Sequence, residues 1–234
     1  AKIEEGDRGE TLTGDIGLNW GDIFPSIENH PSPVGDAFLE KYQRRVTMIP
    51  GSDTLCYGLI WLGHSINDVS LDDEDKLDDA VELFIAQKKW LREYADASKY
   101  YNGLVAGTYW ASMVWSGDLY VLQQENPDLE YSIPVEGSDL WVDVLAIPVQ
   151  APHPNGAHAF INFLIDPAVA AVNAIATWYA PPVEKAYDFL PDFFSDEKNN
   201  PPESLWGKEL EIWRPWTHAE RTMMTEKWRE VELA

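Results

Sequence analysis

The sequence lacks most of the features that assign a function class on sight. It has one cysteine, Cys56, so an internal disulfide is excluded, and its Cys and His residues do not follow zinc-site spacing. No run approaches the roughly 18 consecutive apolar residues of a membrane-spanning helix. Phosphate-binding loops, dinucleotide fingerprints, nucleophile elbows and zinc-protease motifs are also missing. We therefore expect no catalysis, no metal, no cofactor and no membrane insertion of this chain.

Basic residues are scarce. There are 17 Lys and Arg against 40 Asp and Glu, which gives a formal net charge of −23. A surface of this sign repels phosphate backbones and anionic lipids, so we expect no nucleic-acid partner. It attracts cations, but it is also typical of an acidic surface with no ligand. Charge alone therefore does not assign a function.

The pattern of apolar residues predicts an α/β protein, because strands alternate with helices along the chain. The length of 234 residues fits one or two domains. The expected elements are a strand at 45–50, a helix at 55–62, a helix at 70–98, a strand at 113–115, a helix at 118–124, a strand at 131–134, a buried strand at 141–147, helices at 155–164 and 167–177, and a terminal helix at 217–232.

Aromatic residues are abundant, with 11 Trp and 10 Tyr, and two tryptophans precede carboxylates. Trp115 lies three residues before Asp118, and Trp141 lies two before Asp143. Residues i and i+2 of a strand point to the same side, so Trp141 and Asp143 would face one cleft. An indole face beside a carboxylate suits an alkylammonium ligand. The alternative is that Trp141 packs in the core and Asp143 caps a turn, and the spacing alone leaves both open.

Several motifs together carry a family resemblance. Residues 139–148 read D-L-W-V-D-V-L-A-I-P, residues 157–170 follow A-x-x-F-I-N-F-L-x-x-P-x-V-A, and residues 178–180 read W-Y-A. Upstream, W-G-D-I-F at 20–24 precedes them in the expected order. In these motifs the chain resembles the spermidine/putrescine-binding proteins of polyamine ABC importers, over most of residues 17–187.

The resemblance implies a periplasmic-binding-protein-like type II fold, with a mixed sheet and flanking helices. It implies that 1–142 form the main part of the second lobe, that 143–186 return to the first lobe, and that 187–234 pack on the second. Most of the family's N-terminal lobe has no counterpart here, so a separate segment or chain would complete it. The implied partners are a polyamine and an ABC transporter permease. The implied location is periplasmic or membrane-anchored outside the membrane, with an organelle lumen as the alternative.

The resemblance also implies a ligand site built from aromatic rings and carboxylates. The rings would form the walls of a polyamine groove, and the acids would bind its nitrogens. The implied residues are Trp115, Asp118, Trp141, Asp143, Tyr179 and Asp53.

A second hypothesis is a structural or interaction subunit that descends from a binding protein and no longer binds polyamine. Arg214 supports it if its cation points into the groove, where it would pair with the ligand-binding acids; an Arg214 facing solvent would be harmless. Four tryptophans of the tail also support it if they are exposed, because they would then offer a protein contact surface. They are Trp206, Trp213, Trp216 and Trp228.

Overall fold

The structure is a computed structural model that describes residues 3–10, 16–72, 74–195 and 209–234. The α-helices are α1 (Trp20–Ile23), α2 (Pro33–Lys41), α3 (Leu55–Trp61), α4 (Asp75–Lys88), α5 (Ala97–Val105), α6 (Ser116–Glu125), α7 (Pro154–Leu164), α8 (Pro167–Thr177) and α9 (His218–Leu233). Short 3₁₀ helices are η1 (Glu5–Asp7), η2 (Ser52–Thr54), η3 (Glu184–Phe189) and η4 (Asp192–Ser195). The strands are β1 (Gly9–Glu10), β2 (Ile16–Gly17), β3 (Val46–Thr47), β4 (Ala111–Ser112), β5 (Ser138–Leu140) and β6 (Leu210–Ile212).

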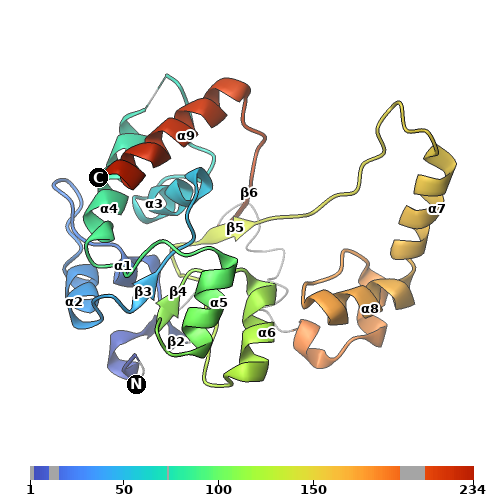
Figure 1. Cartoon of the computed structure of the whole chain (residues 1–234), viewed down its shortest axis with the longest axis horizontal. Coiled ribbons are helices and arrows are strands. Elements are labelled where there is room, and N and C mark those ends of the chain that lie inside the picture. Colours follow the sequence, from blue (N-terminus) through green and yellow to red (C-terminus); the bar gives the residue numbers. More distant parts are fainter. Residues whose placement is uncertain (1–2, 11–15, 73, 196–208) are drawn as a thin grey trace.

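The main body is built on helix packing, and α4 packs against both α3 and α9. Figure 1 shows these three helices grouped on one side of the molecule. Phe84 of α4 is fully buried and meets Phe24 edge-on at 5.3 Å and Trp228 of α9 at 6.0 Å between ring centroids. The start of α9 is fixed by a capping box, in which the Thr217 side chain accepts from the Glu220 N–H and the Glu220 carboxylate accepts from the Thr217 N–H. The last helix therefore returns to the core that the first half of the chain builds.

The strands are short and pair two by two in the described part of the chain. β1 and β2 are antiparallel, whereas β3 with β4 and β5 with β6 are parallel. The expected α/β class with both helices and open sheets is therefore confirmed.

The β5–β6 pair depends on Gly137, whose φ is +113°. A Cβ at this position would lie 2.4 Å from the carbonyl oxygen of Glu209, so only glycine allows the backbone before β5 to approach the backbone before β6 this closely. The Ser138 N–H then donates to Glu209 O at 2.9 Å, and the Trp20 indole N–H donates to Gly137 O at 2.8 Å. These contacts fix the point at which β5 leaves the main body.

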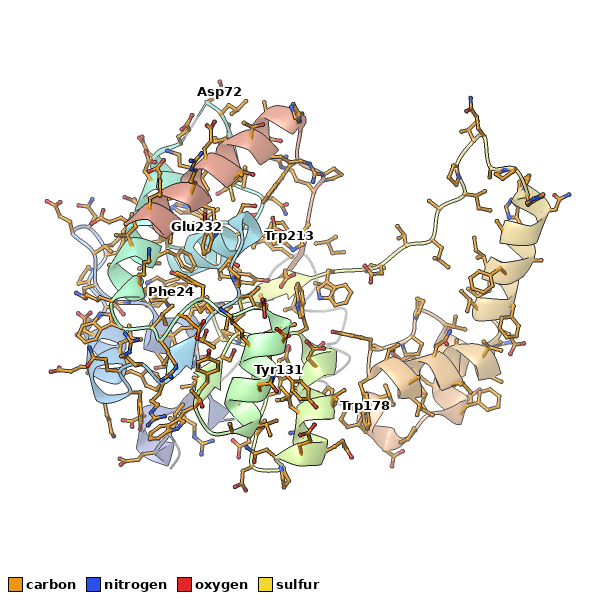
Figure 2. All side chains as sticks on the ribbon, in the orientation of Figure 1. Phe24, Asp72, Tyr131, Trp178, Trp213 and Glu232 are labelled. Atoms are coloured by element: carbon orange, nitrogen blue, oxygen red, sulfur yellow. The ribbon has the colours of Figure 1, made fainter. Side chains whose placement is uncertain are left out.

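Helices α7 and α8 lie to one side of the main body, joined to β5 by a long extended segment (Figure 1). Both begin with proline at the first helical position, and the Asp166 carboxylate accepts from two N–H groups of the first turn of α8. α8 buries small side chains against η3, whereas α7 buries none of its residues in the described structure. Trp178, directly after α8, stacks on Tyr120 of α6 at 6.2 Å and joins this unit to the main body (Figure 2).

The expected buried strand at 141–147 is wrong. β5 ends at Leu140, and the apolar run that follows is exposed, with Val144 at 81% and Val149 fully accessible. The run has the composition of a buried strand but pairs with no strand among the described residues. A strand at 131–134 is also not formed.

The single helix expected at 70–98 is instead α4 followed by α5. Between them the chain runs beside β3: the Arg92 N–H donates to Val46 O at 3.1 Å, and the Ala95 N–H donates to Met48 O at 2.9 Å. The strand-like pairing takes up backbone groups that a continuous helix would have used. The helices predicted near 55–62, 118–124, 155–164, 167–177 and 217–232 are confirmed within two residues at each end.

No single helix of the described residues is long and apolar enough to cross a membrane, and only α7 and α8 taken together, bent by 76° at their break, reach that length and composition. The three tail tryptophans that the structure describes do not form the exposed surface that the second hypothesis needs. Trp228 is buried, and Trp213 and Trp216 pack against the main core at 5.6 Å from each other. Trp206 lies outside the described residues.

Candidate functional site

A cavity of about 1230 Å³ opens where β5, α6 and the segment after α8 meet. Its walls combine aromatic rings with carboxylates and come from segments far apart in the sequence. The aromatic and acidic residues that line it are Trp20, Tyr57, Tyr109, Trp110, Trp115, Asp128, Glu130, Tyr131, Asp139, Trp141, Asp143, Tyr179 and Tyr187.

Three of these rings form a continuous wall, which we call the aromatic trio: Trp115, Trp141 and Tyr179. Trp115 meets Trp141 edge-on at 5.8 Å, and Trp141 meets Tyr179 at 5.3 Å with the rings 69° apart. Such tilted contacts are favourable beyond the area that they bury. The N-cap position of α6, the end of β5 and the segment after α8 each supply one ring. The structure therefore brings together the three rings singled out from the sequence.

Tyr179 is set in place by the residue before it and by α6. Trp178 ends α8 in the left-handed region, with φ +63°, which is unusual for a bulky residue and turns the chain sharply. Trp178 then packs on α6 while Tyr179 faces the cavity. The Tyr179 ring lies so close to Gly117 that a Cβ there would be 2.5 Å from it. Burial, and then the charge of Asp118, raises the pKa of Tyr179, and the Gly117 N–H opposes this by donating to its hydroxyl.

The predicted carboxylates are placed differently from one another. Asp143 is exposed and lines the cavity. Asp118, in the first turn of α6, is not a lining residue, although its charge acts on Tyr179. The buried Tyr100 donates its hydroxyl to Asp118 Oδ2 in a short hydrogen bond, and burial with this bond raises the pKa of Tyr100.

Asp53 lies in η2 and does not line the cavity. Its surroundings raise the pKa of its carboxyl, chiefly through burial, and the neighbouring charges are those of Arg221 and Asp139. The structure thus separates Asp53 from the aromatic trio. Its role as a ligand residue stays a prediction with no geometric support.

Arg214 does not point into the cavity. Its guanidinium forms two hydrogen bonds with the Glu220 carboxylate, at 2.7 and 3.1 Å, and also donates to the carbonyl oxygens of Asn67 and Val69. It therefore ties the start of α9 to the loop before α4, and none of its hydrogen bonds is with Asp118 or Asp143. Of the two orientations considered from the sequence, the harmless one is present.

Nine of the aromatic and acidic lining residues were not predicted as site residues from the sequence, among them Tyr57, Tyr131 and Asp139. For Asp139 a signal was present, because it precedes Trp141 by two residues, the same alternation that links Trp141 to Asp143. Tyr57 sits inside an apolar helix and Tyr131 in a segment without regular structure, so nothing local marked either residue.

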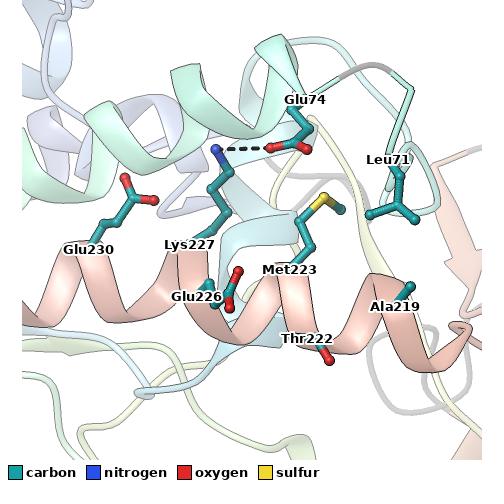
Figure 3. Close-up of a pocket in the computed structure, with 8 residues that line it drawn as sticks. All are labelled: Leu71, Glu74, Ala219, Thr222, Met223, Glu226, Lys227 and Glu230. Atoms are coloured by element: carbon teal, nitrogen blue, oxygen red, sulfur yellow. Dashed lines mark ion pairs between the residues drawn. The ribbon is translucent and has the colours of Figure 1, made fainter.

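A second, smaller pocket of about 480 Å³ lies between α9 and the start of α4 (Figure 3). Its floor includes Leu71 and Met223, and its only basic residue, Lys227, is paired with Glu74 at 3.3 Å and with Asp78. This pocket lacks the aromatic rings of the larger one. Among the described residues, no group of three or more His, Cys, Asp or Glu side chains could hold a metal ion.

Comparison with known proteins gives a consistent result. Residues 35–202 match the family model described as bacterial extracellular solute-binding protein. A putrescine/cadaverine-binding protein of Pseudomonas aeruginosa is 26% identical over 207 residues, which are 84% of this chain and 56% of the relative. The spermidine/putrescine-binding periplasmic protein of Salmonella typhimurium is 35% identical over 103 residues, which are 44% of this chain and 30% of the relative.

A solved structure from Listeria monocytogenes, described as a candidate spermidine/putrescine ABC transporter, superposes with a TM-score of 0.73 at 29% identity. The superposition covers 84% of this chain and 61% of that one. The chain thus has part of a type II periplasmic-binding-protein fold, and it spans between about a third and just over half of the curated relatives named above. On the match to its family model, the chain belongs to the bacterial extracellular solute-binding proteins.

Proposed function

We propose that the protein is the substrate-binding protein of a polyamine ABC importer and captures a putrescine- or spermidine-type ligand without catalysis. The observation that carries this proposal is that the aromatic trio and Asp143 line one cavity. Asp118 lies outside this lining, but its charge acts on Tyr179. The names of the relatives, which are binding proteins for putrescine, cadaverine and spermidine, support the same ligand class.

The chemistry of the cavity suits a slender dication. Ring faces cover methylene groups and attract ammonium groups, which gives about 0.5–1 kcal/mol at exposed sites and about 2 kcal/mol when the contact is desolvated. Carboxylates accept charge-assisted hydrogen bonds from the ammonium protons. In this scheme Trp115, Trp141 and Tyr179 hold the aliphatic chain, while Asp143 and Asp118 bind terminal nitrogens. The net charge of −23 adds long-range attraction for cations.

We further propose that residues 143–186 belong to the first lobe, and that sequence corresponding to the unmatched length of the relatives completes that lobe. The exposed apolar side chains support this assignment, because contiguous exposed apolar surface marks an interface. They include Val144, Leu145 and Val149 of the extended segment and Phe160 and Phe163 of α7. Closure of two lobes on the ligand would exclude water and strengthen each charged contact.

A partner and a cellular location follow from this assignment. The partner is the permease of the importer, and the location is periplasmic or membrane-anchored on the outer side. Family membership supports both, since the family model describes extracellular solute-binding proteins.

Isothermal titration with putrescine and spermidine tests the proposal, on protein expressed from its full coding sequence at low salt. We expect saturable binding that weakens about 10-fold or more, equivalent to about 1.4 kcal/mol, in Trp141→Ala and in Asp143→Asn. Asp75→Asn, an exposed carboxylate of α4 outside the cavity, is the matched charge control and should bind as the parent does. Absence of binding by the parent protein to both ligands would refute the proposal.

A further inference from the structure

Asp139 is a lining carboxylate that neither the family motifs nor the comparisons assign. It is the middle residue of β5, and Trp141 and Asp143 follow it at intervals of two along the same extended chain. All three line the cavity. Figure 1 shows the chain running straight on from β5. At about 3.3 Å per residue, the backbone positions of Asp139 and Asp143 lie about 13 Å apart, with Trp141 between them.

The negative charge of Asp139 is held but not neutralised. The Tyr57 hydroxyl donates to Oδ1 at 2.8 Å and the Trp213 indole N–H donates to Oδ2 at 3.0 Å. The Ser138 hydroxyl also donates to Oδ1, at 3.4 Å. All three donors are uncharged, so they fix the carboxylate without neutralising its charge, and Oδ2 keeps a further lone pair. Among the described residues, Asp139 takes part in no ion pair. A half-buried carboxylate without a cation is costly unless a ligand supplies one.

Two further rings, those of Tyr57 and Tyr131, line the same cavity as the trio and Asp139. Tyr131 lines the cavity, and burial raises its pKa to about 12, with smaller contributions from Asp139 and Tyr179. The Tyr131 phenol therefore lies within range of electrostatic interactions with Asp139 and Tyr179. Burial and the adjacent Asp139 also raise the pKa of Tyr57, which keeps that hydroxyl protonated and able to donate. The cavity wall thus carries acids at two separated places, with rings between them.

We propose that Asp139 forms an additional ammonium subsite, so that the cavity is built for a polyamine with three nitrogens rather than for a diamine. The inference rests on the proposed function and deepens it to a ligand class. A short diamine such as putrescine can occupy the trio with Asp143 but cannot also reach Asp139. A longer triamine such as spermidine can lie along the rings and place an ammonium group at each end.

The test compares two ligands on protein expressed from its full coding sequence. In Asp139→Asn, which removes the charge and keeps the size, we expect spermidine affinity to fall about 10-fold and putrescine affinity to stay within about 2-fold of the parent. Asp75→Asn, which removes an exposed carboxylate of α4 outside the cavity, is the matched charge control, and both ligands should stay within about 2-fold of the parent. Thermal melts report whether each variant is folded.

A ligand-side measurement needs no variant. Terminally acetylated spermidine keeps the chain but loses one end charge, and the parent should bind it about 10-fold more weakly than spermidine. Equal loss of both ligands in Asp139→Asn, no loss of either, or equal binding of spermidine and its acetylated form would overturn the subsite while the polyamine function stands. A parent that binds neither putrescine nor spermidine would overturn the function itself and the subsite with it.

Discussion

Gly117→Ala adds a single methyl group at the point where the Tyr179 ring packs against α6. The added Cβ would lie 2.5 Å from two atoms of the Tyr179 ring, whereas carbon atoms in contact prefer about 3.5–4.0 Å. The ring must therefore move by about 1 Å or the helix must shift. If the ring moves, its contact with Trp141 at 5.3 Å loosens and the hydrogen bond from the Gly117 N–H to the Tyr179 hydroxyl lengthens.

Two opposing effects of the substitution partly cancel in the free energy of unfolding, but no such cancellation is expected in the free energy of ligand binding. Overpacking costs about 1–3 kcal/mol, and alanine in place of glycine in a helix returns up to about 1 kcal/mol. The net loss of unfolding free energy should be about 1 kcal/mol, which urea denaturation can measure. Because Tyr179 is displaced from the aromatic trio, we expect putrescine or spermidine to bind about 10-fold more weakly. The near-ultraviolet circular dichroism of the tryptophans should also change, because Trp141 loses a ring contact.

Gly156→Ala in α7 is the matched control. The Cβ added there has its nearest neighbour at 3.9 Å, an ordinary contact, and lies away from the cavity. It should leave the tryptophan signal unchanged. If Gly117→Ala also keeps the parent's tryptophan spectrum and affinity, the argument that Gly117 positions Tyr179 is refuted.

Three further variants test other contacts. Tyr100→Phe removes the hydroxyl that donates to Asp118, so we expect putrescine affinity to fall about 3-fold. The same substitution should have no effect in protein that already carries Asp118→Asn. An equal fall in both proteins would argue that Tyr100 does not act by positioning Asp118. The hydrogen bond with Arg214 lowers the pKa of Glu220 from 4.5 to about 2, so this carboxylate stabilises the fold above about pH 4.5 and loses the effect as the pH falls towards 2. The stability difference between the parent and Glu220→Gln, measured by urea denaturation, should therefore shrink over that range, and a constant difference would contradict it. Burial raises the pKa of the Cys56 thiol, so a thiol reagent should label the native protein only at the rate of unfolding; fast labelling in native buffer would contradict the buried position.

Local signals were sufficient for most helices. The structure shows local signals that the sequence carries: proline at the first helical position of α7 and α8, and the capping box of Thr217 with Glu220 at the start of α9. The same logic failed at residues 141–147, because an apolar run has the same composition whether or not a partner covers it. It failed again after α4, where pairing with β3 overrode helix propensity.

The candidate site was also predictable only in part from the sequence. The convergence of Trp115, Trp141 and Tyr179 was expected from the family resemblance, since spacing alone left the position of Trp141 open. Asp53 was expected at the groove on sequence alignment alone, and it lies elsewhere because η2 places it near Arg221. Tertiary packing, which no local pattern encodes, brings Tyr57 to β5.

Trp141 and Tyr179 are in contact although the extended segment, α7 and α8 lie between them in the sequence. These intervening residues form an arm whose two ends meet at this contact. Any movement of that arm relative to the main body has to disturb this contact or the stacking of Trp178 on Tyr120. Trp141 and Tyr179 also line the cavity, so a ligand bound against both rings would oppose such a movement. The fluorescence of the Trp141 indole should then report both ligand binding and the position of α7 and α8.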